Sequence, residues 1–89
     1  MKVVITIIGK DRVGIVAMAS NVLAENQVNI LDINQNIVDG FFNMVMIAET
    51  GESKVSLKEL QAIFAEKGKE LGLEIKVQHE DIFQSMHRI

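Results

Sequence analysis

The sequence contains no cysteine, tryptophan or proline and no tyrosine. Without cysteine the chain has no disulfide, no thiolate metal ligand and no thiol nucleophile, which also excludes the copper-carrier version of small α+β domains. Without tryptophan and tyrosine it lacks most of the aromatic platforms on which single-stranded nucleic acids stack. The net charge of −3 further argues against a nucleic-acid partner, because such proteins rely on clustered Lys and Arg.

Long apolar runs are also missing, although 48% of the residues are hydrophobic. No run approaches the roughly 18 residues that a membrane-spanning helix needs, and no charged-then-apolar leader precedes a cleavage site. We therefore expect a soluble, cytoplasmic protein with no membrane partner. The 89 residues predict a single domain, 1–89, that buries only about 60–65% of its unfolded surface and whose stability depends on a partner.

Two segments have the composition of central strands. Residues 2–8 are β-branched at nearly every position, and residues 41–48 are apolar on both faces. Two other segments are typical of sheet edges. Residues 73–78 alternate between apolar and polar, and residues 28–38 mix the two kinds, with a slip at Ile30-Leu31 that indicates a bulge. The edge at residues 28–38 lacks the usual lysine or proline guards, so it invites pairing with another subunit.

Helical periodicity predicts two helices, one from Ile15 to about Asn26 and one along residues 57–71. Asp11 is the expected N-cap of the first helix, whereas Ser56 and Glu59 form a capping box for the second. Gly68 costs about 1 kcal/mol relative to alanine, so we expect the second helix to loosen there. Gly72 is its expected C-cap, and Asp39-Gly40 predicts a tight hairpin.

The resulting order is β-α-β-β-α-β, which predicts an α+β, ferredoxin-like sandwich. Right-handed crossovers place both helices on one face of a four-stranded antiparallel sheet, with strands one and three in the middle. The other face is left partly uncovered, with Val, Ile, Phe and Met side chains facing out, which indicates an oligomer contact. Residues 79–89 carry apolar side chains on one helical face and predict a short amphipathic C-terminal helix.

A polar turn between the first strand and the first helix, residues 9–15, is the strongest candidate for a binding site. Its sequence is Gly-Lys-Asp-Arg-Val-Gly-Ile. The first backbone N–H groups of a helix have no intrahelical partner and carry partial positive charge, so they attract carboxylates or phosphates.

Other chemistries fit the residues less well. Gly9 to Gly14 has P-loop spacing, but Ile15 and Val16 stand where Lys and Ser or Thr are needed. The first strand offers no aromatic residue for an RNA-recognition sheet. His79 and His87 are two helical turns apart, too far for a common two-histidine metal site. No catalytic triad or carboxylate pair is present, so we expect no catalytic residue, no metal, no cofactor and no enzyme activity.

An acylphosphatase-like enzyme stays open as an alternative. Enzymes of that kind hold a phosphoryl group with an arginine in the first turn and an asparagine on the second strand. Arg12 could imitate this pair with Asn29, Asn34 or Asn36. The turn lacks their longer glycine-rich signature, and Asp11 beside Arg12 would repel a phosphate.

The same turn and the strand that follows its helix carry a resemblance to a known family. Residues 11–16 read Asp-Arg-Val-Gly-Ile-Val, residues 23–25 read Leu-Ala-Glu, and residues 28–32 read Val-Asn-Ile-Leu-Asp, with Gln35 following. These segments resemble the opening of an ACT domain. Similar ACT modules occur in glycine-cleavage repressors, in formyltetrahydrofolate deformylases and in small stand-alone ACT proteins. Residues 79–89 resemble the C-terminal tail of the stand-alone group.

The resemblance implies a regulatory module that binds a small ligand, often an amino acid, at the interface of a homodimer formed through the first helix and the second strand. It implies that Asn29 comes from the partner subunit. The implied ligand-binding residues are Asp11, Arg12, Val13, Gly14, Ile15, Asn29 and Ile30. A partner enzyme or regulator would receive the output. The alternative is a ligand-free dimer that docks on such a partner.

Two positions depart from the family's pattern. Val13 replaces the usual proline of the turn, and Gly9 stands where amino-acid-binding members can carry a polar ligand contact. Helix N–H groups and Arg12 nevertheless suit a carboxylate, and Asn29 or Asp11 suits an ammonium group.

Overall fold

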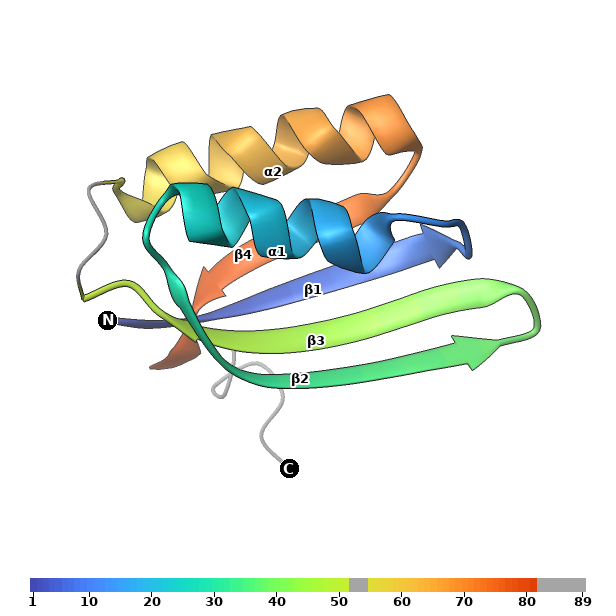
Figure 1. Ribbon diagram of the computed structural model, residues 1–89, viewed down its shortest axis with the longest axis horizontal. Coiled ribbons are helices and arrows are strands. Elements are labelled where there is room, and N and C mark those ends of the chain that lie inside the picture. The colour runs from blue at the N-terminus through green and yellow to red at the C-terminus, as the bar shows by residue number, and fades with distance from the viewer. Residues whose placement is uncertain (52–54, 82–89) are drawn as a thin grey trace.

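The computed structural model describes residues 1–51 and 55–81 (Figure 1). The elements follow the predicted order: β1 (Lys2–Lys10), α1 (Ile15–Glu25), β2 (Asn29–Val38), β3 (Phe41–Glu49), α2 (Leu57–Leu71) and β4 (Glu74–His79). His79 is the last residue of β4, so it does not begin the tail as expected. Residues 82–89 of the predicted C-terminal helix lie outside the described residues.

The four strands form one antiparallel sheet in the order β2-β3-β1-β4. Both helices lie on the same face of this sheet (Figure 1). The ferredoxin-like fold and the central position of β1 and β3 are therefore confirmed. In the described part of the chain, neither helix combines the length and the apolar composition needed to cross a membrane.

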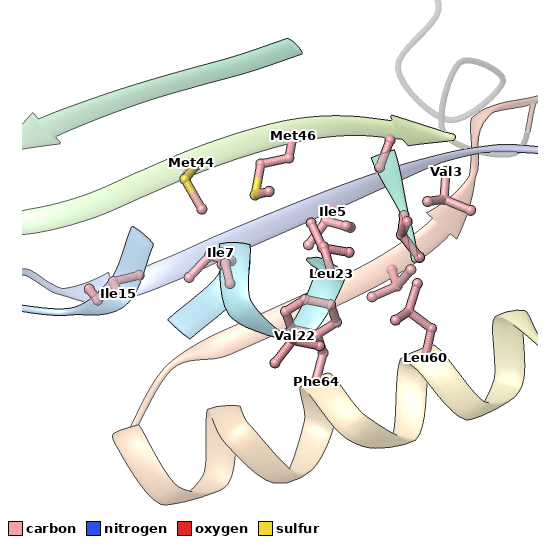
Figure 2. Close-up of a cluster of buried hydrophobic side chains, with 14 of the residues drawn as sticks. Val3, Ile5, Ile7, Ile15, Val22, Leu23, Met44, Met46, Leu60 and Phe64 are labelled. Carbon is pink, nitrogen blue, oxygen red and sulfur yellow. The ribbon is translucent and has the colours of Figure 1, made fainter. Parts of the chain in front are cut away.

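The core lies between the helices and the inner face of β1 and β3 (Figure 2). Met44 and Met46 are 1% and 0% exposed, so the expectation that methionines face outward is wrong for β3. They alternate with Val45, which takes the outer position instead. The apolar side chains exposed on the face away from the helices are Ile8, Val38, Phe41 and Val45.

Strand β2 carries the predicted bulge, since its pairing with β3 shifts between Ile30 and Asp32. Every residue of β2 beyond Ile30 is exposed. Ile33 and Ile37 pair with the buried Met46 and Phe42, so they share the helix-covered side of the sheet. They are nevertheless 40% and 57% exposed, because α1 does not extend over β2 (Figure 1).

Helix α2 begins with the predicted capping box, in which Glu59 N donates to Ser56 Oγ and Ser56 N donates to Glu59 Oε1. The helix continues through Gly68 without a break, so the expected loosening does not occur. A Cβ at position 68 would lie 2.6 Å from the Leu73 carbonyl oxygen. Glycine is therefore needed there because α2 packs directly on the backbone that leads into β4.

Candidate functional site

The turn between β1 and α1 is shorter than the sequence suggests. Strand β1 runs through Gly9 and Lys10, which leaves residues 11–14 as the connection. A Cβ at Gly9 would lie 2.6 Å from Leu73 Cδ2. Gly9 is thus explained by close packing against the α2–β4 connection.

Helix α1 begins at an unusual cap. Gly14 is the N-cap residue, with φ of 94° and ψ of 0°, and no side chain caps the helix. The prediction that Asp11 is the N-cap is therefore wrong, because the chain enters the helix through a left-handed residue three positions later. The first turn of α1 contains no acidic residue. Its positive end is consequently not neutralised by its own first turn.

The exposed Asp11 is held through its backbone. Its N–H donates to the Gly40 carbonyl oxygen at 3.0 Å, which ties the turn to the hairpin between β2 and β3. In that hairpin Asp39 has φ of 53° and Gly40 has φ of 80°, as expected for an Asp-Gly turn. The acceptor is a backbone carbonyl, which no sequence pattern marks.

Arg12 extends in the opposite direction. Its Nη1 donates to the Leu71 carbonyl oxygen at 3.2 Å, at the C-terminal end of α2. The guanidinium thus satisfies a carbonyl that the helix leaves without an intrahelical partner. Because α2 packs on β4 and β2 is the opposite edge of the sheet, this contact directs Arg12 away from Asn34 and Asn36.

The remaining turn residues differ in exposure. Val13 and Gly14 are exposed, whereas the Ile15 side chain is 2% exposed and belongs to the core. Ile15 can therefore offer only its backbone to a ligand, while its side chain anchors the helix start.

Asn29 and Ile30 lie at the far end of the sheet. Asn29 pairs with Glu49, and Glu49 pairs with Lys2 at the start of β1, whereas the turn follows Lys10. Eight residue steps of strand separate Lys2 from Lys10, which is about 27 Å. One chain therefore brings residues 11–15 together but leaves exposed Asn29 and half-buried Ile30 far from them.

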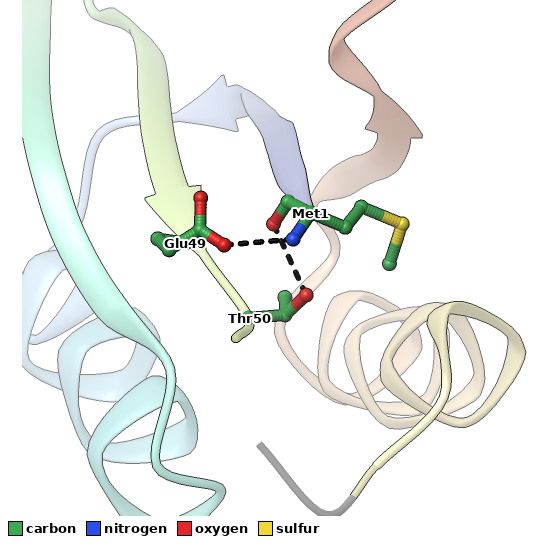
Figure 3. Close-up of polar contacts among 3 residues, drawn as sticks. All are labelled: Met1, Glu49 and Thr50. Atoms are coloured by element: carbon green, nitrogen blue, oxygen red, sulfur yellow. Dashed lines mark hydrogen bonds and ion pairs between the residues drawn. The ribbon is translucent and has the colours of Figure 1, made fainter. Parts of the chain in front are cut away.

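The end of the sheet that carries Asn29 has its own ion pair (Figure 3). The Met1 ammonium group donates to Glu49 Oε1 at 2.7 Å, and Thr50 Oγ1 donates to the Met1 carbonyl oxygen. The hydrogen bond to the ammonium group lowers the pKa of Glu49 below its ordinary value of 4.5. This carboxylate is thus already engaged beside Asn29.

The histidine considered for a metal site has a local partner. His79 Nδ1 accepts a hydrogen bond from the Asp81 backbone N–H at 3.1 Å. Within residues 1–51 and 55–81, no three His, Asp or Glu side chains gather as a metal site would require. His87 lies outside the described residues.

Known proteins are similar to this chain in both sequence and fold. The sequence model of the ACT domain family matches residues 2–78 of this chain. A UPF0237 protein of Neisseria meningitidis serogroup B is 54% identical over 86 residues, which cover 97% of this chain and 96% of that protein. An ACT domain protein from Streptococcus pneumoniae superposes with a TM-score of 0.82 at 37% identity, with 94% of each chain covered.

The two larger proteins named by the sequence resemblance also share the fold. A formyltetrahydrofolate deformylase from Pseudomonas syringae pv. tomato gives a TM-score of 0.80 at 25% identity, covering 88% of this chain and 27% of that one. A proposed glycine cleavage system transcriptional repressor gives 0.74 at 16% identity, covering 86% and 45%. With the family model matched along most of its length, the chain belongs to the ACT domain family.

Proposed function

We propose that this protein is a cytoplasmic, non-catalytic regulatory module that binds a small amino-acid-like ligand at a homodimer interface. One observation carries the proposal. The two halves of the expected site lie at opposite ends of one sheet, about 27 Å apart along β1. A second copy can supply the missing half.

Antiparallel pairing of β2 with β2 of a second copy would create that arrangement. In a two-fold pair of antiparallel strands, the start of one strand lies beside the end of the other. The end of β2 leads into the hairpin that holds Asp11. Asn29 of a second copy would therefore approach the turn. The exposed Ile33 and Ile37 supply apolar surface for the same contact.

The chemistry of the turn suits an amino acid. The N–H groups at the start of α1 attract a carboxylate. Arg12 adds positive charge to the same turn, although its guanidinium is bonded to the Leu71 carbonyl oxygen. The exposed Asp11 or Asn29 accepts hydrogen bonds from an ammonium group. Val13 and Ile30 would contact the ligand's side chain, while Gly14 lets it approach the backbone.

A thermal-shift screen of the proteinogenic amino acids tests ligand binding. A ligand present at about 100 times its dissociation constant adds about 2.7 kcal/mol to the free energy of unfolding. We expect one or a few amino acids to raise Tm, and Asp11→Ala and Asn29→Ala to abolish the shift. Asn21→Ala, at an exposed position on α1, is the matched control. No shift with any amino acid at millimolar concentration contradicts the proposal.

The second candidate is a ligand-free dimer that docks on an enzyme or regulator. It is favoured by the exposed apolar side chains on the sheet face away from the helices: Ile8, Val38, Phe41 and Val45. A dimer that shows no amino-acid shift would support this candidate. Acyl phosphate hydrolysis that is lost in Arg12→Ala would instead contradict both and support an acylphosphatase-like enzyme.

A further inference from the structure

The four-stranded sheet has two outer edges, one on β2 and one on β4. An edge strand presents backbone N–H and C=O groups to which another strand can add. If both edges were open, β2 of one copy could pair with β4 of the next. Such a contact joins two different surfaces and continues into open chains of molecules, whereas β2 with β2 closes as a dimer.

The β4 edge is occupied by a side chain from α2. Gln61 Nε2 donates to the Val77 carbonyl oxygen at 2.7 Å. In an antiparallel strand the N–H and C=O of one residue point to the same side. Met1 and Asp11, which flank β1, both bond to the chain of β3 and its hairpin, so the odd-numbered residues of β1 direct their backbone groups toward β3. Val77 pairs with one of these, Ile5, and therefore directs its own N–H and C=O away from β1, toward the outer edge. The Gln61 amide thus occupies the position from which an added strand would donate a hydrogen bond to the Val77 carbonyl oxygen.

Close packing of α2 on the chain before β4 keeps Gln61 within reach of that edge. Gly68 permits this approach, and the Leu73 N–H donates to the Gly68 carbonyl oxygen at 2.8 Å. An open hollow of about 350 Å³ remains beside the edge, lined by Gln61, Ala65 and residues 75–78. Lys76 lies at the middle of β4, where a charged side chain also disfavours strand addition.

The β2 edge has no such protection. Among the described residues, none of the side-chain hydrogen bonds ends on the backbone of β2. Residues 29–38 contain neither lysine nor proline, and their one charged side chain is Asp32, next to the bulge. The strand is ten residues long, against six for β4. The two edges of the sheet therefore differ in their capacity to accept a further strand.

We propose that Gln61 closes the β4 edge to strand addition, so that copies pair through β2 alone and assembly stops at a closed dimer. The β2 pairing rests on the proposed function, but the effect of Gln61 on β4 does not. Removing the amide opens the Val77 carbonyl and N–H to β2 of another copy.

Light scattering after size-exclusion chromatography tests this inference on the full chain over a wide range of concentrations. We expect Gln61→Ala to form species larger than the wild type, with a mass that grows with concentration. Glu66→Ala on the same helix is the control and should match the wild type. Gln61→Lys keeps a donor and adds a charge at the edge, so it should restore the wild-type mass.

The double variant Gln61→Ala with Ile33→Lys identifies the strand that adds to β4. We expect the growth to be lost, because the charge makes β2 a poor partner. An unchanged mass for a folded Gln61→Ala, with folding checked by circular dichroism, overturns the inference, as does equal growth in Gln61→Lys. A monomeric wild type would contradict the dimer of the proposed function, yet growth in Gln61→Ala would still support the closed edge.

Discussion

Gly68 lies where α2 and the chain leading into β4 come closest, and two physical effects oppose each other there. Alanine favours the helix by about 1 kcal/mol over glycine. However, its Cβ would lie 2.6 Å from the Leu73 carbonyl oxygen, a backbone atom that cannot move aside cheaply. Overpacking of this kind costs about 1–3 kcal/mol.

We therefore expect Gly68→Ala to lower the free energy of unfolding, measured by urea denaturation. Ala65→Gly on the same helix is the control, because it reports the propensity term alone and should cost about 1 kcal/mol. A Gly68→Ala variant that is more stable than the wild type would show that α2 and β4 can separate without cost.

The ion pair between Met1 and Glu49 makes the stability of the chain depend on pH in the acidic range. The pKa of Glu49 is lowered in the folded state by its hydrogen bond to the terminal ammonium group. A carboxylate whose pKa is lower in the folded than in the unfolded state stabilises the fold. This stabilisation is fully present when the pH is above the pKa of the unfolded state, and it is lost as the pH falls through the pKa of the folded state. The loss should therefore appear below pH 4.5.

Glu49→Gln should remove this contribution at neutral pH and flatten the decline of Tm on acidification, followed by calorimetry between neutral and acidic pH. Glu25→Gln, at an exposed position on α1, is the control and should decline as the wild type does. Parallel declines in the wild type and Glu49→Gln would rule out a stabilising role for the pair.

At single residues the sequence identified the site only in part. It marked residues 11–14 as an exposed turn, but Asp11 and Arg12 bind the carbonyls of Gly40 and Leu71. These acceptors lie 29 and 59 positions along the chain and belong to the backbone, which carries no residue-specific signal. The role of Asn29 stays a prediction, since it depends on a second copy.

Whole elements were predicted more fully because their signals are local. The β-branched run of β1, the Asp-Gly hairpin and the capping box of α2 each result from nearby residues. The ends of the strands depend less on nearby residues. β1 continues two residues further than expected, because Gly9 and Lys10 pair with Phe42 and Phe41 of a strand distant in sequence.

The capping box provides a test at the level of the helix. We expect Ser56→Ala to lower the free energy of unfolding by about 1 kcal/mol, since the Glu59 N–H then loses its acceptor. Ser56→Asp keeps an acceptor at the cap and should retain most of the wild-type stability. Equal losses in both variants, measured by chemical denaturation, would mean that the hydroxyl acts elsewhere than at the cap.

At the scale of the molecule, the proposed dimer links stability to protein concentration. Folding coupled to association makes Tm rise as the concentration rises. We expect this dependence in the wild type and its loss in Ile33→Lys, which places a charge on the exposed helix side of β2. Val45→Lys places the same charge on the other face of the sheet and should keep the dependence. A Tm independent of concentration in the wild type would indicate a monomer.

Because of the bulge, β2 contains one residue that has no pairing partner in β3. Leu31 is the extra residue between two pairings, Ile30 with Ala48 and Asp32 with Ile47. A chain that lacked this one residue could keep every other pairing of β2 with β3 and every side chain on its present face. Position 31 is therefore where related chains can gain or lose a residue without changing which residues of β2 pair with β3.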